Sequence, residues 1–143
     1  MGKYSVSLIL LFLAVGTCPQ TDNVPLPNFS GTHINFSNPH PVEGEEITIS
    51  ISVQNTGETS PTLNEDLIVS LFEGDPEKNP LQIMCQQVLI GLDVNQTKTI
   101  RTRWKPPAGP ATIYAVINPN QSEKYIRESD LTDNVAYASL VAS

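Results

Sequence analysis

Basic residues are scarce in this chain of 143 residues, which has 8 lysines and arginines against 15 aspartates and glutamates. The formal net charge of −7 excludes a nucleic-acid-binding protein, because such a protein must neutralise many phosphates. Only 16% of the residues are charged while 39% are hydrophobic, which excludes an acidic disordered segment. The length allows one folded domain and excludes large enzyme folds such as the TIM barrel.

Residues that often carry out catalysis are also few. The two histidines, His33 and His40, both lie in a proline-flanked region near the start of the chain. The Gly-x-Ser-x-Gly, His-Glu-x-x-His and phosphate-binding glycine motifs are absent from the sequence. His33 alternates with Ile34 on an expected edge strand, where a solvated histidine is the simpler interpretation. We therefore expect no enzymatic activity and no cofactor.

The sequence has one long apolar run, at residues 6–15 (VSLILLFLAV). A helix of this length spans about 15 Å, half of the roughly 30 Å hydrocarbon core of a bilayer, which is typical of a signal peptide. Ala14 and Gly16 supply the small residues for cleavage before Thr17. We predict a signal peptide over residues 1–18, a secreted or cell-surface protein, and no membrane span in the mature chain. A buried N-terminal strand is the competing interpretation.

The chain has two cysteines, Cys18 and Cys85, and the sequence leaves their states open. Cys18 is a candidate for a bacterial lipobox and a lipid anchor, although Thr17 is larger than the residue that normally precedes such a cysteine. If Cys18 stays in the chain, export permits a disulfide between Cys18 and Cys85. Cys85 also continues the alternation of Leu81 and Ile83, which favours a small buried side chain.

After a proline-rich, extended linker at residues 19–27, the chain alternates between apolar and polar residues. The clearest case is the stretch 47–53, whose isoleucines and valine at every second position point to one face of a strand. The same pattern, with turn residues between the segments, predicts further strands at 29–36, 66–73, 81–91, 97–105, 111–118 and 134–142. A domain over residues 28–143 with these strands and no long amphipathic helix is expected to be all-β, an immunoglobulin-like seven-stranded antiparallel sandwich. A closed barrel is the structural alternative.

An ordered set of short motifs resembles one known family. The set comprises Pro41-x-x-Gly44-Glu45-x-Ile47-x-Ile49-x-Ile51-x-Val53-x-Asn55-x-Gly57, Leu92, Ile100-x-x-x-Trp104, Gly109, Ile117-Asn118-Pro119, Ile126-x-Glu128 and Asn134. This order over residues 28–141 is similar to the CARDB domain, the cell-adhesion-related domain found in bacteria and archaea. The resemblance implies an immunoglobulin-like sandwich on a secreted or surface protein, an adhesive or scaffolding role, and no catalysis. Asn118 replaces the usual aspartate of the family, and Asn95 replaces a frequent turn glycine.

Two groups of charged side chains are candidates for binding. Glu128, Asp130 and Asp133 lie close together in the sequence and are weak candidates for a Ca²⁺ site, against the simpler interpretation of a hydrogen-bonded hairpin. Arg101 and Arg103 face the same way on one expected strand. They form a positive face that suits an anionic partner, unless they only keep a sheet face solvated.

Asparagine glycosylation is a further prediction, if the host modifies asparagine in Asn-x-Ser/Thr sequons. The candidate asparagines are Asn28, Asn35, Asn95 and Asn120. Trp104 is the single tryptophan, and its alternation with Ile100 favours the core over a sugar-stacking role.

Together these observations favour a non-catalytic, exported adhesion or binding module that acts at the cell surface. Its partner is expected to be an extracellular protein, a polysaccharide or a second copy of the chain, and not nucleic acid. One alternative is a structural subunit of a filament or surface layer, with the segment 19–27 added as a strand to the next copy. Another is a carbohydrate-binding module, for which Tyr114, Tyr125 and Tyr137 are the candidate aromatic platform.

Overall fold

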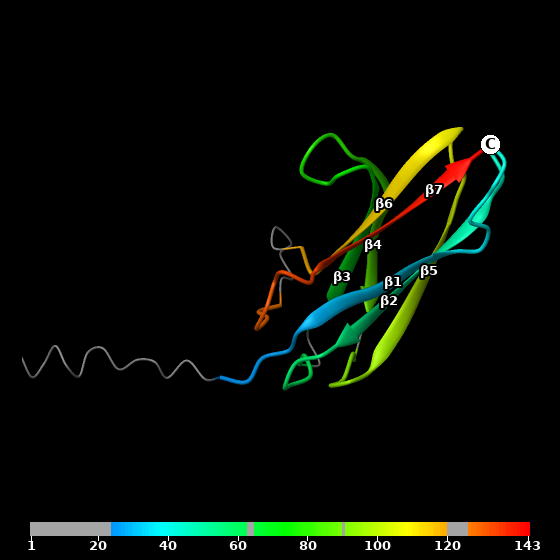
Figure 1. The fold of residues 1–143 in the computed structure, drawn as a ribbon. Helices are drawn as coiled ribbons and strands as arrows, with labels where there is room; N and C mark the ends of the chain where they lie inside the picture. The colour runs from blue at the N-terminus through cyan, green and yellow to red at the C-terminus, as the bar shows by residue number, and fades with distance from the viewer. Residues whose placement is uncertain (1–23, 63–64, 90, 120–125) are drawn as a thin grey trace, which may run out of the picture.

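The computed structural model describes residues 24–62, 65–89, 91–119 and 126–143, with the backbone alone at 84–89 (Figure 1). The predicted signal peptide, Cys18 and the side chain of Cys85 lie outside the described residues. Within the described part of the chain, no helix is long and apolar enough to cross a membrane.

The seven expected strands are present, with ends that lie within two residues of the predicted ones. They are β1 (Phe29–Phe36), β2 (Ile47–Asn55), β3 (Leu67–Glu73), β4 (Leu81–Leu89), β5 (Thr97–Trp104), β6 (Gly109–Ile117) and β7 (Val135–Ala142). The largest difference at a strand start is in β6, because Gly109 and Pro110, expected to be part of a turn, already pair with Ala142 and Val141 of β7.

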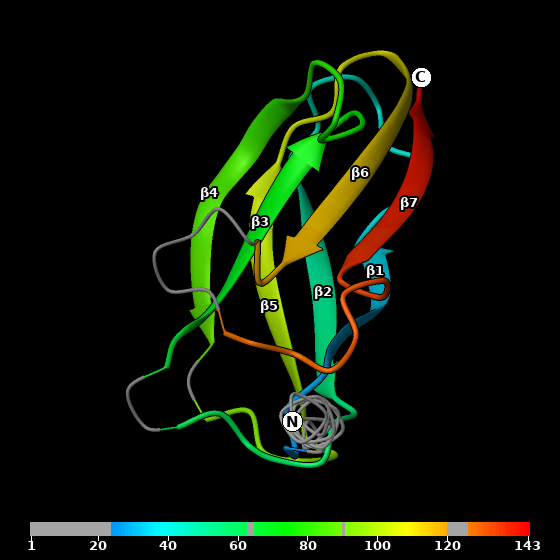
Figure 2. The ribbon, with the colours of Figure 1, turned by 90° about the vertical axis from the view of Figure 1, so that its left-hand side faces the viewer.

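The strands form two antiparallel sheets, one with the order β1-β2-β5 and one with the order β4-β3-β6-β7. Figure 2 shows the four-stranded sheet in front of the three-stranded sheet. The immunoglobulin-like sandwich is therefore confirmed, and the closed-barrel alternative is wrong because the two sheets keep separate edges.

The core lies between the sheets and takes one face of each strand. In β2 the isoleucines and valine at alternate positions from Ile47 to Val53 are all buried. Trp104 is only 9% exposed and packs in the same hydrophobic cluster as Ile49, Ile51 and Ile100, as predicted. The alternation predicted for β4 holds less well, since Leu81 at the first position of the strand, beside the β3–β4 turn, is 65% exposed.

The segment that leads into β1 is bound to the domain. The carbonyl oxygens of residues 26–28 accept backbone N–H groups from Glu58, Ser129 and Thr56, at 3.0, 3.1 and 2.7 Å respectively. The last residues of the expected linker are therefore part of the folded unit, and they contact the β2–β3 and β6–β7 connections at one end of the sandwich.

Candidate binding surfaces and a buried carboxylate

Glu128, in the connection between β6 and β7, carries a buried carboxylate that joins three parts of the chain. The residue is 8% exposed. Its Oε1 accepts the backbone N–H of Phe29 at 2.7 Å. Its Oε2 accepts the side-chain amides of Asn118 at 2.6 Å and Asn134 at 2.5 Å. The start of β1, the end of β6 and the residue before β7 are thus held by one side chain.

The two amides that face Glu128 are fixed in orientation by further hydrogen bonds. Asn118 has a left-handed backbone, with φ 52°. Its Oδ1 accepts the N–H of Ile126 at 3.0 Å, and its Nδ2 donates to the carbonyl of Ile126 at 2.6 Å. Asn134 also donates to the carbonyl of Ile117 at 3.0 Å. Both amides therefore present N–H groups to Glu128, and the site is complementary to an acceptor-only carboxylate.

Burial raises the pKa of Glu128 above its ordinary value, and the hydrogen bonds from Asn118, Phe29 and Asn134 oppose this rise. The nearby charge of Asp133 adds to the rise. The pKa of Glu128 is therefore set by a competition between desolvation of the charged form and the N–H groups that surround it.

The three predicted carboxylates of this region have separate partners. Asp130 is exposed, and its Oδ1 accepts both the N–H and the hydroxyl of Thr132, at 2.8 and 2.7 Å, which lowers its pKa. Asp133 accepts the side-chain amide of Asn28 at 3.0 Å. In the part of the chain that the structure describes, no group of three or more His, Cys, Asp or Glu side chains is placed to hold a metal ion. The segment has the hydrogen-bonded turn at Asp130 that the simpler interpretation requires.

A third buried amide, that of Asn55, joins the turns at the same end of the sandwich. Its Oδ1 accepts the N–H groups of Asn28 and Gly57, at 3.2 and 3.0 Å. Its Nδ2 donates to the carbonyls of Thr59 and Leu92, at 2.9 and 3.0 Å. The asparagine and the glycine of the Asn55-x-Gly57 motif therefore act together to close this end of the core.

The glycosylation candidates differ in accessibility. The side-chain nitrogen of Asn28, the atom that would carry a glycan, already donates to Asp133 and Thr56, each at 3.0 Å. A glycan at Asn28 would disrupt these bonds. Asn35 and Asn95 are both exposed, and Asn120 lies outside the described residues.

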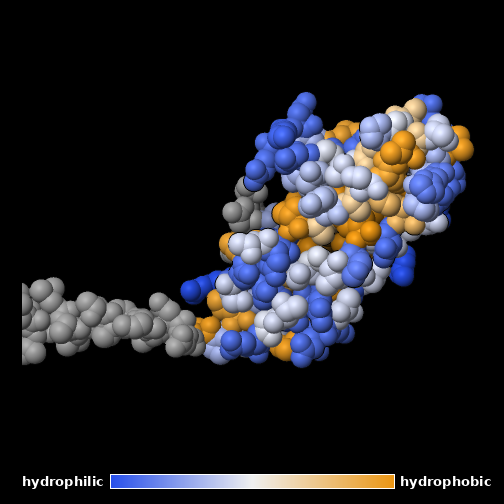
Figure 3. Space-filling model, viewed as in Figure 1, coloured by the Kyte–Doolittle hydropathy of each residue, from blue (hydrophilic) through white to orange (hydrophobic). Residues whose placement is uncertain are grey.

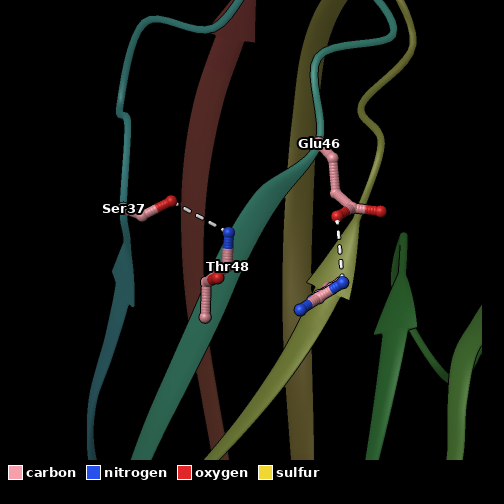
Figure 4. Close-up of polar contacts among 4 residues, drawn as sticks. Ser37, Glu46 and Thr48 are labelled. Atoms are coloured by element: carbon pink, nitrogen blue, oxygen red, sulfur yellow. Dashed lines mark hydrogen bonds and ion pairs between the residues drawn. The ribbon is translucent and has the colours of Figure 1, made fainter.

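Arg101 and Arg103 lie on the outer face of the three-stranded sheet, where both are exposed. Arg103 forms an ion pair with Glu46 at 3.5 Å, which is the dashed line that ends on Glu46 in Figure 4. The same figure shows Ser37 accepting the backbone N–H of Thr48 at 2.9 Å. One of the two predicted cations is thus partly neutralised within the chain, which weakens the case for an anionic partner on this face.

The outer face of the four-stranded sheet has a pair of tyrosines. Tyr114 of β6 and Tyr137 of β7 are directly opposite each other in the register, and their rings stack with centroids 5.7 Å apart. Tyr137 is 71% exposed, and Val135 and Val141 on the same face of β7 are 47% and 59% exposed. Figure 3 shows apolar side chains gathered over β7. The third candidate, Tyr125, lies outside the described residues.

The β3–β4 turn forms two hollows with this face. One hollow, of about 570 Å³, lies between Glu73, Lys78 and Asn79 near the turn and Thr112 and Tyr114 on β6. The other, of about 330 Å³, lies between residues 76–77 of the turn and Val116, Leu131 and Val135. Thr112, Tyr114 and Val116 are alternate residues of β6, so both hollows lie along one strand. This arrangement depends on the β6–β7 register and the position of the turn, which sequence patterns did not define.

Comparisons with known proteins agree with the fold. The CARDB family model matches residues 32–138, which confirms the resemblance. The CARDB domain of a Pyrococcus furiosus protein, crystallised in complex with di-metal ions, has a TM-score of 0.65 at 14% identity, and the match covers 84% of this chain and 96% of that one. A protein from Geobacter metallireducens, solved in solution, has a TM-score of 0.56 at 28% identity, over 77% of this chain and 91% of that one.

One further match is to a small part of a larger enzyme, and it shows a shared fold alone. A β-glucosidase from Erythrobacter marinus matches 82% of this chain at 16% identity and a TM-score of 0.52, but the match covers only 16% of the enzyme. No curated protein matches the sequence.

Proposed function

The chain belongs to the CARDB family, and on that premise we propose that it is an exported, non-catalytic adhesion or binding module that holds a partner at the cell surface. The observation that carries the proposal is the outer face of the four-stranded sheet, where Val135, Tyr137 and Val141 are exposed together. Large apolar side chains that are exposed together on one face are typical of a site of interaction. Exposed apolar and aromatic side chains of this kind are suited to holding a partner.

Two further features support the proposal. The apolar run at residues 6–15 has the length of an export signal, which would deliver the domain to the cell surface or the medium. His33 and His40 are both exposed, and His33 lies on β1, in the sheet opposite the tyrosine pair. A catalytic role would need a base held near a second reactive group, in a protected site.

The experiment measures binding of the exported chain, labelled with a fluorophore, to cell envelopes of the native host. The Tyr137→Ala variant tests the proposed face, and Arg101→Ala is the matched control on the outer face of the other sheet. We expect the wild type and Arg101→Ala to bind alike, and Tyr137→Ala to bind about tenfold more weakly, the effect of losing one aromatic contact.

Other results would contradict the proposal. Absence of envelope binding by the wild type would exclude an adhesive role on that surface. Loss of binding in Arg101→Ala alone would place the partner on the three-stranded sheet. Negative-stain images of filaments formed by the exported chain would favour the alternative of a structural subunit.

A further inference from the structure

The tyrosine pair leaves one aromatic side chain largely exposed beside polar groups. Tyr114 covers part of the Tyr137 side chain, and 71% of Tyr137 stays exposed. On the next outward-facing pair of the same two strands, the hydroxyls of Thr112 and Ser139 lie 2.8 Å apart. An aromatic face with hydroxyl groups beside it matches a sugar ring, which has an apolar C–H face and a polar edge.

The nearby hollow adds polar groups that are free to bind. In the part of the chain that the structure describes, neither the Glu73 carboxylate nor the Asn79 amide has a hydrogen-bond partner. Asp75, in contrast, accepts the N–H of Glu77 at 2.9 Å and lies 3.9 Å from the ammonium of Lys78. Glu73 provides acceptors and Asn79 provides both a donor and an acceptor, so together they can pair with sugar hydroxyls, which donate and accept.

The charge of this region indicates which partners it would reject. Residues 73–78 bring three carboxylates to the hollows, from Glu73, Asp75 and Glu77, against one ammonium, from Lys78. The whole chain has a net charge of −7. An acidic polymer and a second copy of the chain would both be repelled here, whereas a neutral molecule would not.

The size of the region suits more than one sugar ring. The hollows of about 570 and 330 Å³ fall in the range of about 300–1,000 Å³ that is common for small-molecule sites. They follow β6 from Thr112 to Val116, and the four residue-to-residue steps between these positions span about 13 Å at roughly 3.3 Å each. An extended ligand that follows the strand can contact Tyr114, Tyr137 and both hollows.

We propose that this face binds a neutral oligosaccharide or a segment of a neutral polysaccharide, with a sugar ring stacked on Tyr137 and hydroxyls bonded to Glu73 and Asn79. This inference rests on the binding role proposed above and names the chemistry of the partner.

The test is affinity electrophoresis of the exported chain in native gels that contain one polysaccharide each. The probes are four neutral polymers, a β-glucan, an α-glucan, a mannan and a galactan, with acidic alginate for comparison. We expect at least one neutral polymer to retard the wild type, and the retardation to be insensitive to salt because no ion pairs form. Calorimetry with an oligosaccharide of the retarding polymer then gives the dissociation constant.

Variants separate a specific site from a change in folding. Tyr137→Ala is expected to weaken binding about tenfold, while Tyr137→Phe keeps the ring and stays within about threefold of the wild type. Glu73→Gln and Asn79→Ala are each expected to weaken binding severalfold, and Arg101→Ala is expected to have no effect. Circular dichroism and the melting temperature show whether each variant is folded, and Glu73→Gln tests the site even if Tyr137→Ala fails to fold.

The inference would be overturned if no neutral polymer retarded the chain, or if alginate alone did. Unchanged binding in Tyr137→Ala would also overturn it. So would a dimer, seen in sedimentation, that Tyr137→Ala abolishes. If envelope binding depends on Tyr137 while every neutral polymer fails, the saccharide inference is wrong and the proposed adhesive function stands. If the wild type binds neither envelopes nor polysaccharides, both fail.

Discussion

Replacing Glu128 by glutamine keeps the shape of the side chain but, we expect, destabilises the fold. One carboxylate oxygen accepts the N–H of Phe29, and the other accepts the amides of Asn118 and Asn134. In either orientation, the NH₂ group of a glutamine therefore points at an N–H donor. Asn118 cannot reverse its amide to compensate, because both ends are bonded to the backbone of Ile126.

The size of the effect follows from the number of donors affected. The better orientation of glutamine keeps its oxygen on the two amides and leaves the N–H of Phe29 without an acceptor, at a cost of about 1–3 kcal/mol for an unsatisfied buried donor. Removal of the charge works in the opposite direction, because burial of the carboxylate raises its pKa. We expect Glu128→Gln to lose about 2 kcal/mol of unfolding free energy. Glu128→Ala leaves all three donors without their acceptor and is expected to lose about 4 kcal/mol.

The measurement is urea unfolding monitored by the fluorescence of Trp104, the single tryptophan, which is buried in the folded state. Asp130→Asn is the matched control. It changes an exposed carboxylate in the same connection and keeps an oxygen for Thr132, so a change below about 0.5 kcal/mol is expected. A Glu128→Gln variant as stable as the wild type, or more stable, would refute the reasoning, because removal of the desolvated charge would then offset the loss of an acceptor for the N–H of Phe29.

The dependence on pH has a definite sign. The folded-state pKa of Glu128 is raised, so its contribution to stability is complete below the ordinary pKa and is lost as the pH rises through the raised value. The pKa of Asp130 is lowered, so its contribution is present above the ordinary pKa and is lost as the pH falls through the lowered value. Carboxyl titration by NMR is expected to show Glu128 above 4.5 and Asp130 below 3.8.

Four further predictions concern other parts of the chain. Trp104→Ala is expected to lose about 3–5 kcal/mol in urea unfolding followed by circular dichroism, and a loss under about 1 kcal/mol would show that the ring adds little to the core. Gly57→Ala is expected to lower the melting temperature strongly, since the added Cβ would collide with the backbone of Asn28; an unchanged melting temperature would contradict this. Millimolar Ca²⁺ is expected to leave the melting temperature unchanged, whereas a rise of several degrees that Asp130→Ala or Asp133→Ala abolishes would indicate a cation site. Mass spectrometry of the exported protein is expected to find its N-terminus before residue 22, and intact Lys3 would contradict export with cleavage.

Strand positions could be predicted from the sequence because burial on one face of a sheet imposes a period of two on the chain. The stretch 47–53 shows that period without interruption, and its apolar residues are buried as expected. The sequence predicts a start of β6 two residues too late, because Gly109 and Pro110 are typical of turns. Only the pairing with the last strand shows that they extend β6.

The tyrosine pair and the buried carboxylate could not be predicted in the same way. Tyr114 and Tyr137 meet because of the β6–β7 register, and the connection between these strands is too long to fix a register as a tight hairpin does. Glu128 is charged and lies in a loop, so its sequence context indicates exposure. Its burial depends on a donor at Phe29, which is 99 residues away in the chain.

The hydrogen bonds around the entry to β1 also determine how the domain bears mechanical load. Tension on the chain before residue 26 first meets the bonds of residues 26–28 to Glu58, Ser129 and Thr56, and then the bond between Phe29 and Glu128. These contacts reach both the β2–β3 and the β6–β7 connections, so the load is shared between the two sheets before β1 can peel from β2. When the domain is pulled from this end, the Glu128 carboxylate therefore helps to hold the first residue of β1 in place, and this contact requires neither a disulfide nor a metal ion.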